Sequence, residues 1–249
     1  MEITFYIFLV LHIISGFTAF VAAPVAMMVI KGGNKHRLFG KVFFWSMTGV
    51  CATGFIMSVF HSNLFLFMIS GFSYYLVASG YRWIYRKKAI GIREIATIDW
   101  TLLIGAAIFN TALFAFGVNT IFHAPGNSFG YIATVFGILG LRLVWRNYHQ
   151  LIRPSESKYA WMLNHMGGMI GGYIATVSAF SAVNFNFLPT IIQWLWPTII
   201  GVPLLMMWIN YYKRKFKSGA KIQELVELKE TTSLTENFMQ TGKAVHLRE

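Results

Sequence analysis

Charged residues are scarce in this chain. Of its 249 residues only 12% are charged, while 56% are hydrophobic, and the mean hydropathy is +0.55. Soluble domains carry about 25% charged residues. Half of that fraction, together with 17% aromatic residues, indicates that lipid is the main solvent of this protein.

Cysteine and the common catalytic motifs are also scarce or absent. The chain has one cysteine, Cys51, so no internal disulfide can form and a metal site built on thiolates is excluded. It contains no P-loop, no Ser-His-Asp order and no HExxH or HxxxH pair. Sequence motifs therefore assign no enzyme class to it.

The basic residues that are present gather in four groups. All 21 Lys and Arg fall within residues 31–41, 82–93, 142–158 and 213–248, whereas the segments around 61–63, 123–127 and 184–186 have none. The positive-inside rule then puts the four basic groups in the cytoplasm. The net charge of +12 thus reflects membrane topology. We expect anionic lipid at the cytoplasmic face as a partner, and no nucleic acid.

Seven apolar segments lie between these groups, each long enough to cross a bilayer, which takes about 20 helical residues. They cover approximately residues 3–30, 42–60, 64–81, 100–122, 128–145, 160–183 and 188–212. The predicted fold class is an all-α polytopic membrane helix bundle of seven transmembrane helices, with the N-terminus outside and the C-terminus in the cytoplasm. Residues 213–249 are expected to form a basic tail, at first partly amphipathic and then disordered.

The sixth segment contains the densest run of small residues. Four glycines, Gly167, Gly168, Gly171 and Gly172, follow directly after His165. Glycines in a membrane helix let a neighbouring helix or a flat ligand approach the backbone closely. Gly168 and Gly172 are therefore candidates to receive a porphyrin, although tight packing against another helix is the favoured interpretation. His12 and Gly16 begin a similar pattern in the first segment and are candidates on the same grounds.

Six histidines sort by expected topology into two sets. The outer set is His12, His61 and His123, and the inner set is His36, His149 and His165. His165 lies roughly 8 Å into its helix at 1.5 Å per residue. The depths of His12 and His165 then differ by about 15–20 Å in a core about 30 Å thick. One ion therefore cannot bind both.

The inner set predicts a metal or haem site. His36, Asp99 and His165 are the expected ligands, because imidazole and carboxylate groups suit zinc or iron. Lys35, Arg37 and Arg82 are available to a substrate phosphate or carboxylate or to haem propionates, and Trp194 is a candidate to line a substrate pocket. In the alternative interpretation His36 is a solvated loop residue, Asp99 caps a helix, and His165 is hydrogen-bonded to a neighbouring backbone.

Several short motifs resemble those of one family. They are His12-x-x-x-Gly16, Lys31-Gly32-x-x-x-His36-Arg37-x-x-Gly40, Ser79-Gly80-Tyr81-Arg82 and His165-x-x-Gly168-x-x-x-Gly172. Together they resemble a family of bacterial predicted membrane proteins, a domain of unknown function, over roughly residues 5–212. The resemblance implies a bacterial inner-membrane bundle and no particular activity. The missing HxxxH pair argues against zinc-dependent seven-span hydrolases of the ceramidase and progestin-receptor type.

Three functional hypotheses follow. The first is a metal- or haem-binding protein, redox or hydrolytic, with its site near the cytoplasmic ends of spans 4 and 6. The second is a small-molecule transporter that uses a broken seventh span. The third is a membrane sensor or partner-binding subunit that uses the basic tail. A homo-oligomer is compatible with each.

Overall fold

The computed structural model describes residues 2–87, 95–153 and 157–221. Within these ranges the chain forms seven long α-helices and one short 3₁₀ helix, and no strand. The elements are α1 (Glu2–Met28), α2 (Asn34–Phe60), α3 (Leu64–Arg82), η1 (Trp83–Arg86), α4 (Thr97–His123), α5 (Ser128–Ile152), α6 (Ala160–Asn184) and α7 (Thr190–Lys217). All seven long helices are long and apolar enough to cross a membrane. The predicted all-α bundle is confirmed, with seven helices that are able to span a membrane by length and composition.

The turn between α2 and α3 agrees with the sequence prediction, whereas the course of α7 differs from it. The long apolar run divides at residues 61–63, as predicted: Ser62 adopts a positive φ of 49°, and the Asn63 side chain accepts a hydrogen bond from the Leu66 amide, which starts α3. In contrast, α7 is one continuous helix although Pro197 and Pro203 lie inside it, and it extends beyond residue 212 to Lys217. The remainder of the predicted tail, residues 222–249, lies outside the described residues.

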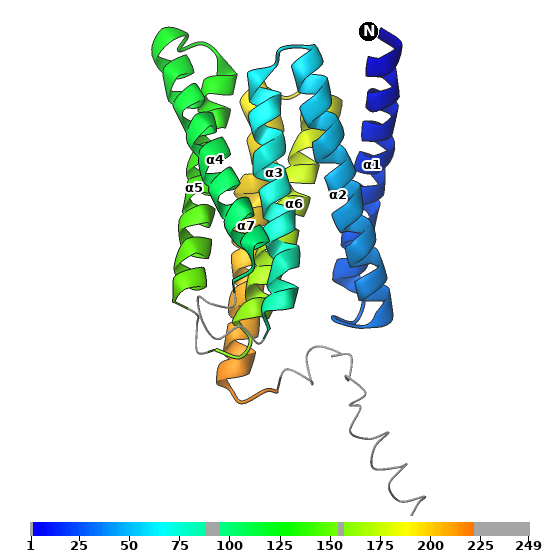
Figure 1. The fold of residues 1–249 in the computed structure, drawn as a ribbon, viewed down its shortest axis with the longest axis vertical. Coiled ribbons are helices and arrows are strands. Elements are labelled where there is room, and N and C mark those ends of the chain that lie inside the picture. The colour runs from blue at the N-terminus through cyan, green and yellow to red at the C-terminus, as the bar shows by residue number, and fades with distance from the viewer. Residues whose placement is uncertain (1, 88–94, 154–156, 222–249) are drawn as a thin grey trace, which may run out of the picture.

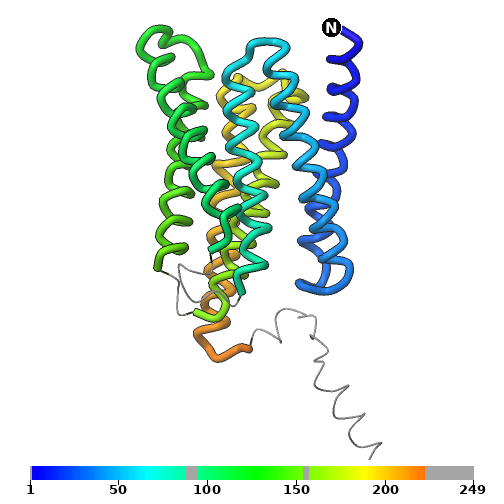
Figure 2. The backbone as a smooth tube through the Cα atoms, viewed as in Figure 1, coloured from blue at the N-terminus to red at the C-terminus, as the bar shows by residue number. Residues whose placement is uncertain are grey.

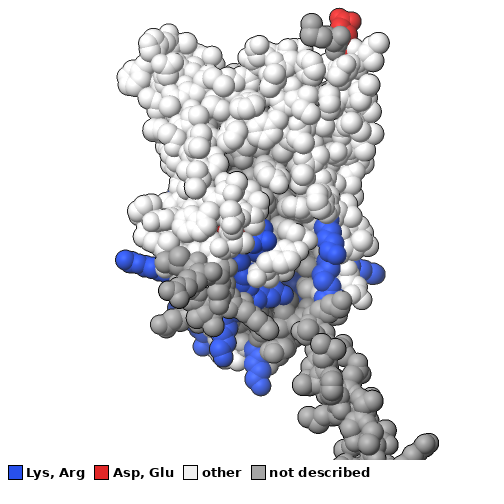
Figure 3. Space-filling view, viewed as in Figure 1, with Lys and Arg blue, Asp and Glu red and all other residues white. Residues whose placement is uncertain are grey.

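The helices are arranged around α3 and α6. Helix α3 packs against α2, α4 and α6, while α1 packs mainly on α2, α5 on α4 and α7 on α6 (Figure 1). The N-terminus lies at the same end as the α2–α3 and α4–α5 turns, and the last turn of α7 lies at the opposite end (Figure 2). Because consecutive helices alternate in direction, the described Lys and Arg residues collect at that opposite end (Figure 3). We call it the basic end.

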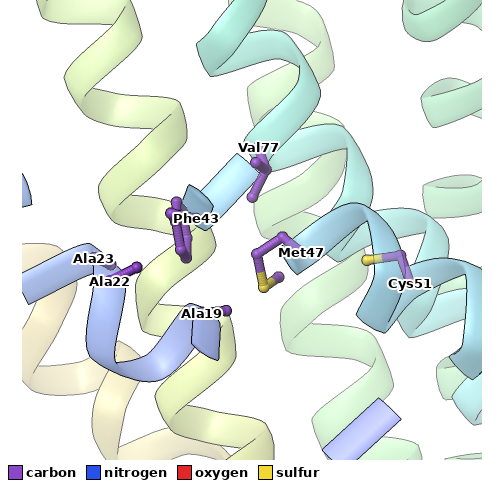
Figure 4. Packing of buried hydrophobic residues seen from close by; sticks show 7 residues of the cluster. All are labelled: Ala19, Ala22, Ala23, Phe43, Met47, Cys51 and Val77. Atoms are coloured by element: carbon purple, nitrogen blue, oxygen red, sulfur yellow. The ribbon is translucent and has the colours of Figure 1, made fainter. Parts of the chain in front are cut away.

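Small side chains let α1 approach α2. Ala19, Ala22 and Ala23 of α1 form a buried cluster with three α2 side chains and with Val77 of α3 (Figure 4). The three α2 residues are Phe43, Met47 and Cys51. Without a hydrophobic driving force between helices in lipid, close packing of this kind supplies much of the association free energy.

Helices α3 and α6 approach each other closely at their glycines. A Cβ atom added at Gly168 would lie 2.4 Å from the Gly80 Cα, and one added at Gly80 would lie 2.8 Å from the Met169 amide nitrogen. A Cβ atom at Gly172 would lie 2.3 Å from a methyl group of Val77. Helix α3 therefore covers the face of α6 on which Gly168 and Gly172 lie. This agrees with the interpretation of the glycine run as a place of tight helix packing.

Substitution of Gly168 tests this contact. We expect Gly168→Ala to lower the free energy of unfolding by about 1–3 kcal/mol, because the added methyl group meets backbone atoms that cannot turn aside. The measurement is thermal or denaturant unfolding of the purified protein in detergent. Gly105→Ala in α4 is the matched control, since its Cβ atom would meet nothing within 4 Å. Equal stability of the two variants would contradict the packing described here.

Candidate ligand site at the basic end

Two histidines from distant parts of the chain meet at the basic end. His36 lies in the first turn of α2 and His165 in the second turn of α6. Their ring centres are 6.3 Å apart and the ring planes are inclined at 75°. Both rings line one cavity of about 230 Å³, bounded by α1, α2, η1, α6 and α7.

Each of these histidines is held by a backbone carbonyl through the same ring atom. His36 Nδ1 lies 2.8 Å from the Ala26 oxygen, and His165 Nδ1 lies 2.9 Å from the Gly80 oxygen. A carbonyl oxygen only accepts, so Nδ1 carries the proton in both rings, and Nε2 of the neutral imidazole keeps its lone pair. Histidines that bind metals are oriented in this way by their second nitrogen.

The fold explains why these carbonyls are in reach. Ala26 and Gly80 lie in the last turns of α1 and α3, where carbonyl groups lack the amide partner of a continuing α-helix. The close contact of Gly80 with Gly168 brings the carbonyl of Gly80 to His165, which lies three residues before Gly168. The short loop between α1 and α2 returns His36 to the end of α1 in the same manner.

Three cations join the histidines in the cavity wall. They are Lys31, Arg37 and Lys87, and no Asp or Glu among the described residues lines this cavity. Lys31 donates to the carbonyls of Met27 and Val29 and lies over the ring of Trp208. Burial lowers the pKa of Lys31, and burial and the nearby Arg37 lower the pKa of Lys87. A cation without a partner carboxylate favours an anionic ligand group.

The rest of the wall is apolar and aromatic. Trp161, Tyr173 and Trp208 contribute rings, and Met27, Met162, Met166 and Met169 contribute flexible side chains. Lys87 lies over the ring of Trp161, 4.4 Å from its centre. A cavity of this composition suits a ligand with an apolar body and an anionic group.

Asp99, the third expected ligand, is held elsewhere. Both of its carboxylate oxygens accept hydrogen bonds from Arg82, at 2.8 Å from Nε and 3.0 Å from a terminal nitrogen. It lines a separate, smaller cavity. In the described ranges no three His, Cys, Asp or Glu side chains are grouped to hold a metal ion. The two histidines come together, and Arg82 keeps the carboxylate away from them.

The other expected site residues are divided between this cavity and the helix contacts. Arg37 lines the cavity and donates to Asn34 Oδ1 at 2.7 Å, while Lys35 is exposed and does not line it. Arg82 is bound to Asp99. Trp194 packs in an apolar cluster, with its ring centre 5.2 Å from that of Phe65.

None of the four residues expected to bind a cofactor lines the cavity. His12 Nδ1 lies 2.9 Å from the Thr53 hydroxyl of α2. A Cβ atom at Gly16 would meet a methyl group of Val50 at 3.9 Å, so that glycine faces α2. Gly168 and Gly172 face α3, as described above. These four positions hold helices together in the structure.

The sequence interpretation missed several cavity residues. Trp161 lies four residues before His165, a spacing that puts both on one face of α6, so it was open to prediction. Lys31 and Lys87 belong to basic groups that topology already explained. Trp208 had no local signal, because its position depends on how α7 packs against α6.

No protein-family model, curated protein or solved structure matches this chain. The resemblance of its motifs to a family of bacterial predicted membrane proteins therefore stays a prediction. The candidate site rests on the geometry of the described residues.

The pairing of Asp99 with Arg82, outside the candidate site, can be tested by substitution. We expect Arg82→Leu to lower the free energy of unfolding by about 3–5 kcal/mol, because it leaves a buried carboxylate without its cation. The double variant Arg82→Leu/Asp99→Leu should recover much of that loss, since no uncompensated charge remains. Denaturant unfolding of both variants measures the difference. A double variant no more stable than Arg82→Leu would refute this account of the pair.

Proposed function

We propose that this multi-pass membrane protein binds haem at its basic end, with His36 and His165 as the two axial iron ligands, and acts in redox chemistry. The pair of imidazoles, each with Nδ1 bound to a carbonyl and with ring centres 6.3 Å apart, carries the proposal. A metal–nitrogen bond of about 2 Å plus the radius of the ring puts each ring centre about 3 Å from a shared ion. Two such ligands on opposite sides of one ion have ring centres about 6 Å apart.

The number of ligands favours haem over zinc. Zinc sites in proteins use three or four protein ligands, whereas the described residues supply two histidines here. A porphyrin brings its own equatorial nitrogens, so that two histidines complete the coordination of its iron. Lys31, Arg37 and Lys87 are placed to neutralise the two propionates. Asp99, expected among the ligands, has no part in this site.

The size and the wall residues of the cavity determine whether a porphyrin can enter it. At about 230 Å³ the cavity is smaller than the roughly 300–1,000 Å³ of typical ligand pockets, so the walls have to open for a porphyrin. Four methionines line it, and methionine side chains repack readily around irregular shapes. The small residues Ala23, Ala26 and Gly40 also line it and keep the α1 and α2 backbones accessible.

Each group of the protein has a distinct part in the proposed activity. Bound haem supplies one-electron chemistry. The carbonyls of Ala26 and Gly80 hold the imidazoles in one tautomer and raise the basicity of Nε2. The aromatic and methionine walls exclude water, which tunes the potential of a buried haem.

The orientation in the membrane is a further part of the proposal. The basic end faces the cytoplasm of a bacterial cell, in its inner membrane, with the N-terminus outside and the C-terminus inside. The positive-inside rule supports this, because the described members of the basic groups lie at one end. The haem edge is then accessible to cytoplasmic electron carriers and to anionic lipid headgroups.

The haem proposal predicts a visible spectrum. Protein purified from cells supplied with a haem precursor should show the Soret and α bands of low-spin haem in about one-to-one stoichiometry. His36→Ala and His165→Ala should each abolish or shift these bands, because each removes an axial ligand. His12→Ala is the matched control, since His12 is also a membrane histidine bound through Nδ1. Correctly folded protein that stays colourless, or that carries zinc by elemental analysis, would rule the proposal out.

The orientation predicts which introduced cysteines can be labelled. In a Cys51→Ala background, Gly126→Cys in the α4–α5 turn should react with a membrane-impermeant maleimide on intact spheroplasts. Ser218→Cys at the end of α7 should react only after permeabilisation. Both positions are exposed, so accessibility to the reagent reports the side of the membrane. The reverse pattern would overturn the proposed orientation without affecting the haem site.

A further inference from the structure

A second, smaller cavity lies on the other side of α3 from the histidines. It measures about 20 Å³ and is bounded by α3, η1, α4 and α5. Its polar wall consists of Tyr75, Ser79, Arg82, Arg86, Asp99 and Asn147. Trp83, Leu102 and Leu151 complete the wall.

Two buried polar atoms of this wall have no protein partner within the described ranges. They are Asn147 Oδ1, an acceptor, and Arg86 Nε, a donor. The Asn147 side chain is 4% exposed. Buried amide and guanidinium groups are nearly always hydrogen-bonded, to protein or to ordered water. Both atoms therefore point to a ligand shared across this cavity.

The neighbouring bonds show which hydrogen-bonding groups remain. Asn147 Nδ2 donates to the Tyr75 hydroxyl at 2.9 Å, so the hydroxyl proton of Tyr75 is left to donate. Asp99 takes two of the donors of Arg82. The groups left for a ligand include two donors, Arg86 Nε and the Tyr75 hydroxyl, and one acceptor, Asn147 Oδ1.

We infer that this cavity binds one water molecule. The water accepts hydrogen bonds from Arg86 Nε and the Tyr75 hydroxyl, and it donates to Asn147 Oδ1. Three hydrogen bonds are typical of a buried water, and a cavity needs about 10–15 Å³ to hold one. The cavity is large enough for one water and too small for a larger ligand.

The hydrogen-bonding groups around the cavity favour water over an ion. Arg82 and Arg86 repel a cation, and only Asp99 faces them with a negative charge. A simple anion has no proton to donate, so it would leave the Asn147 oxygen without a hydrogen bond. A neutral ligand that both donates and accepts fits these groups, and water is the smallest one.

The water has a structural consequence for the histidine cavity. It joins η1, which carries Arg86, to α5, which carries Asn147, and to Tyr75 of α3. Ile84 of η1 and the next residue after η1, Lys87, line the histidine cavity. The water therefore positions one wall of that cavity, whatever ligand binds there.

Radiolytic footprinting of the full chain in lipid nanodiscs tests for the water. Hydroxyl radicals formed from a bound water oxidise the side chains next to it even when bulk solvent is excluded. Tyr75, Trp83 and Leu151 are at most 9% exposed, and we expect their oxidation to exceed that of equally buried apolar residues several-fold. Leu113 of α4 and Phe136 of α5, which belong to one apolar cluster with residues of α3, are the controls, at 0% and 3% exposed. Oxidation of all five at the same low rate would show a dry cavity and overturn the inference.

Substitutions at Asn147 test whether this residue binds the water. Asn147→Leu keeps a similar volume but removes the acceptor, so oxidation of Tyr75, Trp83 and Leu151 should fall to the control level. Asn147→Asp keeps an acceptor oxygen and should retain the oxidation. If Asn147→Leu does not fold, Tyr75→Phe removes one donor and should lower the oxidation of Trp83 and Leu151. Undiminished oxidation in a folded variant that lacks the acceptor or the donor would overturn the assignment.

Discussion

The contact between the backbones of α3 and α6, at Gly80 and Gly168, is the constraint on which both cavities of this protein depend. Only glycine at both positions lets the helices come this close. Their contact puts the Gly80 carbonyl against His165 Nδ1, so Nε2 is the nitrogen of that ring that keeps its lone pair. On the opposite face of the same turn, Ser79 and Arg82 face α4 and α5. One helix crossing therefore positions the candidate ligand site and the polar cluster behind it.

Charge is distributed between these two cavities in a consistent way. The only aspartate of the chain is paired with Arg82 and lies in the small cavity. Among the described residues, the lysines and the arginine of the large cavity therefore have no carboxylate beside them. Removing a charge from water is costly in a membrane, and pairing Asp99 avoids that cost. The same pairing leaves the large cavity with a surplus of positive charge. The proposed haem, with its two propionates, would meet that surplus.

Part of the candidate site could be predicted from sequence. His36 and His165 were grouped because both fall near basic segments, and topology puts such segments at one end of a bundle. Asp99 was grouped with them for the same reason. The expected depth of a residue in the membrane, however, does not show which helices of the bundle lie next to it. Helix α3 lies between α4 and α6, and Arg82 on α3 takes the carboxylate before it can reach His165. Trp194 was expected to line a pocket and Trp208 was not. In the structure Trp194 lies in an apolar cluster and Trp208 in the cavity wall, and the sequence does not show which helices pack against each part of α7.

The sequence by itself determined the number of spans, their approximate ends and the side on which the basic groups gather, because hydropathy and charge act on each segment separately. It also marked the glycine run of α6 as a place of close approach. Only the tertiary structure decided which helix approaches there, which carbonyl holds each histidine, and which cation holds Asp99. These depend on the rotation of each helix about its own axis and on its neighbours. Both follow from side-chain packing between segments distant in the chain, which no local pattern contains.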